Sequence, residues 1–152
     1  MKLTTFSDYS IRVIMYLGIQ HGKLVNISDI AKAYSISENH LMKVVHHLGQ
    51  HKYVETVRGK GGGLKLVRDP KTINIGELLR GTEGDAGFLP CLDTDGACCI
   101  QSTCKLMGIL REAQIALFDV LDSYTLADLL VPETQLTSIL MNPQPIKLTD
   151  NS

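Results

Sequence analysis

Apolar positions in the first part of the chain recur every three or four residues, the spacing of helices that bury one face. The first such block predicts a helix over residues 7–20, with Phe6 leading into it. Thr5 could cap this helix, with Asp8 three residues later in the capping-box position. The chain therefore opens on an amphipathic helix whose first turn carries an acid.

Two further blocks follow at short intervals. One predicts a helix over residues 28–34 with Asn26 as a favourable cap, and the next a helix that Ser37 caps and that ends near Gln50. Only a short break, Ser35–Ile36, separates them. Two short helices joined by so tight a turn are typical of a helix-turn-helix.

Next, alternating apolar and polar residues predict two strands, at residues 53–57 and 64–67. The glycine-rich segment between them, residues 58–63, permits a tight turn and carries Arg58 and Lys60 at its tip. A hairpin with a basic tip directly after a helix-turn-helix indicates a winged helix.

The second half of the chain predicts a short helix at 73–80, a glycine-rich loop at 81–103 and a long amphipathic helix at 105–123. One more turn is expected at 126–130, and a loosely ordered tail beyond Pro132. The long helix has an apolar stripe made of Leu106, Ile109, Leu110, Ala113, Leu117, Val120 and Leu121. A second copy of the chain is the simplest partner for this stripe, although it could pack on its own domain.

The expected fold is mainly α with a small β-hairpin wing: a winged helix-turn-helix followed by a long dimerisation helix. Its parts are the DNA-binding domain (1–80), a cysteine loop (81–104), a dimerisation region (105–130) and a flexible tail (131–152).

Composition and charge narrow the function. The 152 residues, 44% apolar and 20% charged, are ordinary for a soluble domain; no membrane span or secretion signal is evident, so a cytoplasmic protein is expected. The net charge of -1 says nothing about nucleic acid, but residues 37–71 are locally basic and acids dominate from Thr72 onward. This asymmetry favours one basic face for a polyanion, although a merely solvated surface would look similar.

In a winged helix the third helix enters the major groove, so its outward residues are candidate DNA contacts. These are Ser37, Asn39, His40 and Lys43, with His46 and His47 as further candidates. On the wing, Arg58, Lys60 and the neighbouring Gly62 are expected at the minor groove or at phosphates. A helical protein–protein module with a basic surface remains the alternative.

All four cysteines, Cys91, Cys98, Cys99 and Cys104, lie close together in one loop. Clustered cytosolic cysteines bind metal or act in redox chemistry more often than they form disulfides. The spacing lacks the tight Cys-x-x-Cys pairs of zinc sites and of thiol redox enzymes, and three well-spaced thiolates suit an iron–sulfur cluster. Structural zinc and metal-free thiols remain open on spacing alone.

Four segments, residues 4–10, 37–41, 57–64 and 124–129, closely resemble the NsrR family of nitric-oxide-sensing repressors. That family belongs to a group of winged-helix regulators that also includes IscR and RirA. The resemblance covers roughly residues 1–130, including the cysteine loop, and implies a homodimer that binds operator DNA.

The resemblance also implies the cluster ligands. Cys91, Cys98 and Cys104 would hold the cluster, leaving Cys99 as a bystander, although the choice between Cys98 and Cys99 stays open. Asp8 of the partner subunit would be the fourth ligand. On sequence alone the favoured role of this acid is instead the capping residue of the first helix, with an i,i+4 pair to Arg12 as a further alternative. IscR-like proteins have a histidine where this chain has Met107.

The expected function is therefore a nitric-oxide-responsive transcriptional repressor without enzymatic activity. The cluster-bearing dimer would bind its operator, and nitrosylation of the cluster would release it. A 4Fe–4S cluster is favoured, with 2Fe–2S possible. The alternative is a regulator that senses iron or cluster supply, as IscR and RirA do.

Overall fold

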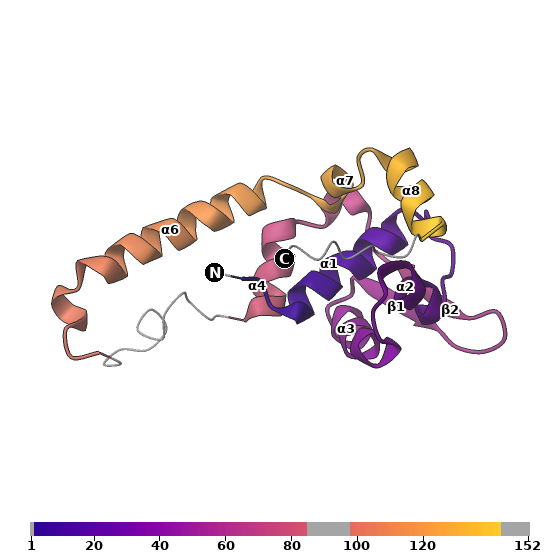
Figure 1. Ribbon diagram of the computed structural model, residues 1–152, viewed down its shortest axis with the longest axis horizontal. Coiled ribbons are helices and arrows are strands. Elements are labelled where there is room, and N and C mark those ends of the chain that lie inside the picture. The colour runs from indigo at the N-terminus through magenta and orange to yellow at the C-terminus, as the bar shows by residue number, and fades with distance from the viewer. Residues whose placement is uncertain (1, 85–97, 144–152) are drawn as a thin grey trace, which may run out of the picture.

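The computed structural model describes residues 2–84 and 98–143. The first helix, α1 (Thr5–Gly18), lies at the centre of the molecule and packs against α3, α4, α7 and the wing (Figure 1). Its cap is Thr4, whose side chain accepts a hydrogen bond from the Ser7 backbone N–H. The predicted Thr5 cap is therefore wrong by one position, and Asp8 lies one residue beyond the capping-box position.

The helix-turn-helix is confirmed. Helix α2 (Ile27–Tyr34) ends at Ser35, which adopts the left-handed conformation with φ of 54°. The chain then enters α3 (Glu38–Gln50), whose cap Ser37 accepts a hydrogen bond from the His40 backbone N–H, as predicted. Asn26 precedes α2 but its side chain makes no capping hydrogen bond.

The wing is an antiparallel hairpin of β1 (Val54–Val57) and β2 (Gly63–Leu66). Strand β2 also pairs with the segment before α2: Val25 and Leu64 exchange backbone hydrogen bonds of 2.9 and 2.7 Å. The hairpin is thereby fixed to the base of the helix-turn-helix, and the turn between its strands projects away from the body (Figure 1).

After the wing come a 3₁₀ turn, η1 (Pro70–Thr72), and helix α4 (Ile75–Glu83). Beyond the residues that are not described lie a second 3₁₀ turn, η2 (Gln101–Thr103), and the long helix α6 (Lys105–Asp122). The short helix α7 (Leu126–Leu129) follows as predicted.

The expected loose tail beyond Pro132 is wrong for α8 (Glu133–Met141). This helix packs against α2, with Leu140 buried in the core and Leu136 packed against it. His21 also forms an ion pair with Glu133 at the start of the helix. Prolines near this segment suggested a loose tail, but the apolar contacts order it.

One hydrophobic core holds α1, α2, α3, α4, α7 and the wing together. Its fully buried side chains include Val13, Ile14 and Leu17 of α1, Leu41 and Leu48 of α3, and Leu78 and Leu126. Helix α6 differs: none of its residues is buried, and it extends away from the body as an arm (Figure 1). No helix in residues 2–84 and 98–143 is long and apolar enough to cross a membrane.

Candidate DNA-binding and sensor site

Helix α3 presents a polar face away from the core. Leu41, Val44, Val45 and Leu48 are buried, and the residues on the opposite side are exposed. Of the predicted DNA contacts, Ser37, Asn39, His40 and Lys43 are all exposed, as is His46. Helix α3 therefore offers the amide, imidazole and ammonium groups that can bond base edges and phosphates.

The histidines of α3 are not equivalent, because one edge of the helix faces α1. The His47 ring packs edge-on against Phe6 at 5.2 Å, and the His51 ring lies 4.2 Å from it. Burial, the nearby His51 and the nearby His46 together lower the pKa of His47, against an opposing hydrogen bond to the backbone of Gly81. His47 is thus a packing residue between α3, α1 and α4, whereas His46 is exposed.

At the wing tip, Arg58 and Lys60 are both exposed. Gly62 also has a structural role in the turn. A Cβ atom there would lie 2.2 Å from the Val57 carbonyl oxygen and 3.0 Å from that of Gly59. The turn can therefore close only without a side chain at position 62, so Gly62 shapes the wing that presents the two cations.

Asp8 lies in the first turn of α1 and is partly exposed. Its carboxylate accepts a hydrogen bond of 3.0 Å from Arg12 Nε, the pair that the sequence suggested as one alternative. The Arg12 guanidinium in turn lies 5.5 Å from the centre of the Tyr34 ring. Burial is the main cause that raises the pKa of Tyr34 to about 12. Because Tyr34 ends α2, these contacts connect Asp8 to the turn of the helix-turn-helix.

The end of α4, where the cysteine segment begins, is tied to the start of α1. The Glu83 carboxylate accepts hydrogen bonds from the Thr4 backbone N–H at 2.8 Å and from its hydroxyl at 3.0 Å. Ser7 donates to the Thr82 hydroxyl at 2.8 Å. Burial tends to raise the pKa of Glu83, but hydrogen bonds from Ser7 and Thr4 outweigh it and the net pKa is lowered.

Two of the three predicted cysteine ligands fall within the described residues. Cys98 is exposed, and Cys104 is half-buried at the N-terminal cap of α6. The unpaired N–H groups of that helix end suit a negatively charged sulfur ligand. Cys91 lies outside the described residues, and Cys99 is exposed beside Cys98.

Within residues 2–84 and 98–143 of a single chain, no three His, Cys, Asp or Glu side chains form a metal site. The predicted set also requires Cys91 and a carboxylate from a second chain, so the described part of one chain holds it only in part. The donor chemistry fits: closely spaced thiols, and at least one at a helix N-terminus, suit an iron–sulfur cluster.

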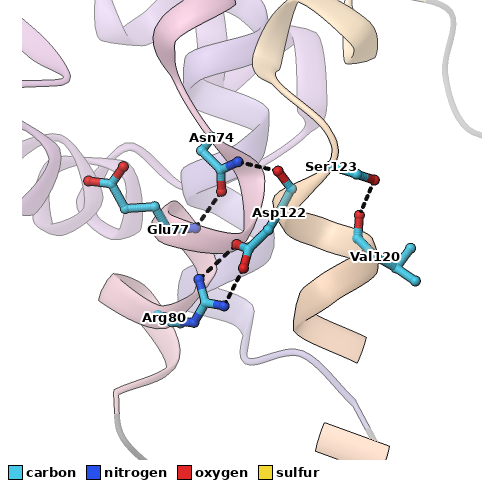
Figure 2. A network of polar contacts seen from close by, with 6 residues as sticks. All are labelled: Asn74, Glu77, Arg80, Val120, Asp122 and Ser123. Atoms are coloured by element: carbon cyan, nitrogen blue, oxygen red, sulfur yellow. Dashed lines mark hydrogen bonds and ion pairs between the residues drawn. The ribbon is translucent and has the colours of Figure 1, made fainter. Parts of the chain in front are cut away.

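The far end of α6 is fixed to α4 by a polar network (Figure 2). Arg80 pairs with both carboxylate oxygens of Asp122, at 2.8 and 2.6 Å, and Asn74 donates to the Asp122 carbonyl at 2.6 Å. The Arg80 guanidinium also stacks 4.4 Å from the centre of the Phe118 ring. Helices α4 and α6, which flank the cysteine segment, are therefore joined at one end.

Comparison with known proteins identifies this arrangement. The model of the Rrf2 family, described as iron-dependent transcriptional regulators, matches residues 3–132. The chain belongs to the Rrf2 family. As predicted, it is a winged-helix transcriptional regulator and not an enzyme, and DNA is its partner.

Relatives that match nearly the whole chain are named NsrR. The chain is 49% identical over 142 residues to the transcriptional regulator NsrR of Bacillus subtilis, covering 92% of this chain and 97% of that protein. It is 43% identical to NsrR of Geobacillus kaustophilus, covering 92% and 97%. These relatives confirm the resemblance found in the sequence motifs.

Solved Rrf2-type structures have the same architecture. The structure of IscR from T. potens matches with a TM-score of 0.70 and 26% identity, covering 90% of each chain. CymR, the global cysteine regulator of B. subtilis, matches with a TM-score of 0.66 and 27% identity, covering 85% of this chain and 95% of that one.

Sequence reasoning missed several residues that the structure brings to the site. Glu83 and the Arg80–Asp122 pair join positions 79 and 42 apart in the chain, and no local pattern reveals such pairs. Met42 was not singled out either, although it is exposed on α3, unlike the other large apolar residues of that helix. Its place beside the helix's polar residues at 39 and 43 was the available signal.

Proposed function

We propose that this Rrf2-family chain is a nitric-oxide-responsive repressor that binds operator DNA in the cytoplasm as a homodimer. An iron–sulfur cluster, 4Fe–4S rather than 2Fe–2S, would be held by Cys91, Cys98 and Cys104 and by Asp8 of the partner subunit. The observation that carries the proposal is the placement of the two helices that flank the cysteine segment in the chain. Helix α4, before it, is bonded to the first turn of α1 next to Asp8, and helix α6, after it, extends away from the body.

A homodimer is supported by the exposed apolar surface of α6. Leu106, Ile109 and Val120 are 53%, 60% and 58% exposed and belong to the stripe that the sequence showed. Apolar surface of this extent costs free energy in water and marks an interaction site. A second α6 offers a stripe of the same kind, and a two-fold arrangement buries both at once.

Dimerisation and cluster binding would then depend on one another. Cys104 opens the helix that forms the interface, and Asp8 lies on the other protomer's body in the proposed ligand set. When bound, the cluster would supply iron atoms that react with nitric oxide. The protein ligands of those iron atoms would be lost in that reaction. A ligand from each protomer would hold the two DNA-binding domains at a fixed separation.

The chain's own contacts suggest how a change at Asp8 reaches the DNA-reading helix. With the Asp8 carboxylate bonded to Arg12, the guanidinium is held near the Tyr34 ring. When Asp8 binds the cluster, Arg12 is free to change its contact with Tyr34 at the end of α2, and loss of the cluster would return the carboxylate to Arg12. Because α2 leads through a tight turn into α3, this return would shift the orientation or spacing of the recognition helices, and two half-sites would no longer be reached together.

A sensor of iron or cluster supply, of the RirA or IscR type, would use the same cysteines, and the description of the Rrf2 family as iron-dependent regulators is consistent with it. Met107, where IscR-like proteins have a histidine, favours the Asp8 ligand and with it the nitric-oxide sensor. The two functions differ in their signal. A promoter controlled by a nitric-oxide sensor responds to nitric oxide, and one controlled by an iron or cluster sensor responds to iron starvation.

The test begins with anaerobic purification of wild type, Cys98→Ala and Cys99→Ala proteins, followed by native mass spectrometry. We expect the wild type and Cys99→Ala to be brown dimers with iron and sulfide, and Cys98→Ala to lack them. Cys99→Ala is the matched control, since it removes the adjacent thiol.

The second step measures binding of each cluster-loaded protein to a DNA duplex selected by the wild type from a randomised pool. We expect nitric oxide to weaken binding at least tenfold. Wild-type protein without iron and sulfide, or equal DNA binding before and after nitric oxide, would refute the proposed sensor.

A further inference from the structure

Helix α3 carries one large apolar side chain outside the core. Its other large apolar residues, Leu41, Val44, Val45 and Leu48, are at most 8% exposed, whereas Met42 is 52% exposed. Met42 is the fifth residue of α3, in the N-terminal part of the helix. In helix-turn-helix proteins this part of the recognition helix meets the base edges.

The position of Met42 around the helix separates it from α1. At 100° per residue, His40 lies 200° away from Met42, and the His40 ring is on the side of Tyr9 in α1. Asn39, Lys43 and His46 lie between these two edges and are exposed. Met42 therefore borders the polar face of α3 on the edge away from α1.

The position of Met42 beside polar residues determines which groups of the major groove it can contact. The polar neighbours of Met42 can form hydrogen bonds with base edges and with phosphates, whereas its thioether is poorly suited to such bonds. The C5-methyl of thymine is the apolar group that the major groove presents, and a flexible, polarizable methionine side chain packs well on such a group. An exposed methionine among polar DNA contacts thus has a defined apolar target.

We infer that Met42 is a specificity-determining residue that packs on a thymine methyl group in each operator half-site. The inference rests on the DNA-binding function and adds a base preference to it. Burying one methyl group corresponds to about fourfold in affinity per half-site, or roughly 15-fold when both half-sites are changed. Asn39 and Lys43 would read or hold neighbouring positions.

The test uses full-length, cluster-loaded dimers of the wild type, Met42→Ala and Ile139→Ala. Each selects binding sequences from a randomised duplex pool. The wild-type sequence is then made with thymine or with deoxyuridine, which differs only in lacking the methyl group, at each position in turn. Ile139→Ala is the control, because Ile139 is an exposed apolar residue, 64% exposed, on α8.

We expect the wild type and Ile139→Ala to select thymine at one symmetric position and to lose about fourfold per half-site with deoxyuridine there. Met42→Ala should lose that preference alone and bind both duplexes equally. A selected operator whose thymine preference and deoxyuridine response survive in Met42→Ala would overturn this inference and leave the DNA-binding function intact. Failure of the wild type to select any common sequence would overturn both.

Discussion

Replacing Gly62 by alanine tests whether the wing has the tight turn seen here and whether that turn matters for DNA. The new Cβ would lie 2.2 Å from the Val57 carbonyl oxygen and 3.1 Å from the Arg58 carbonyl carbon. Ordinary non-bonded carbon–oxygen contacts begin about 1 Å beyond the first of these distances. The obstacle is backbone rather than a flexible side chain, so the turn itself must open.

The loss of folding stability in Gly62→Ala can be worked out from the contacts that an opened wing turn would strain or lose. Overpacking of this kind costs about 1–3 kcal/mol, and loss of the 3.0 Å hydrogen bond from the Gly62 N–H to the Gly59 carbonyl adds about 1 kcal/mol. For a chain of this length, roughly 2–4 kcal/mol lowers Tm by about 5–15 °C. Gly61→Asn is the matched control: Gly61 has a φ of 80°, which asparagine tolerates, and a Cβ there meets nothing within 4 Å.

The functional readout is the salt dependence of binding to the selected operator duplex. Each lost phosphate contact reduces the slope of log K against log salt by about 0.9. Displacing Arg58 and Lys60 in both protomers would therefore reduce the slope by about 3 to 4. An Arg58→Ala/Lys60→Ala double variant should give the same slope with a wild-type Tm.

Two results would refute this reasoning in different ways. A Gly62→Ala protein with the Tm of the wild type would mean that the wing turn is not as tight as the structure has it. A lowered Tm with an unchanged salt slope would mean that the wing cations do not contact phosphates.

Two further predictions concern α6. A Cβ at Gly76 would lie 2.0 Å from Asp122 Oδ1 and 3.1 Å from its backbone nitrogen, so Gly76→Ala should destabilise the protein by about 1–3 kcal/mol in urea unfolding. Gly81→Ala, in the same helix with nothing within 4 Å, should instead be neutral or stabilising by up to about 1 kcal/mol; equal effects would contradict the close approach. Ile109→Lys should convert the dimer to a monomer in sedimentation velocity, whereas Ile115→Lys, on the opposite side of α6, should not. A dimer that survives Ile109→Lys would place the interface elsewhere.

Local features were predictable from the sequence because their causes are local. Apolar spacing, the Ser37 cap and the glycine-rich turn placed the helix-turn-helix and the wing to within a few residues. The error at the first cap has a partly non-local reason: Thr4 and Thr5 are chemically equivalent candidates, and Thr4 is selected by its contact with nearby Ser7 and by its contact with distant Glu83. The order of α8 could not be predicted, because it depends on packing against α2.

The features of the site also divide into those that the sequence determines and those that tertiary contacts determine. The sequence alone determined which residue types are present and how they are spaced: thiols in one loop, cations on a wing, an acid in the first helix. It did so because spacing along helices and turns follows from covalent geometry and hydrogen bonding between near neighbours. Only the tertiary structure decided that His47 packs between helices and that Met42 faces outward. These roles depend on which distant segments meet, and contacts between residues 42 or 79 positions apart are fixed by packing of the whole chain rather than by local pattern.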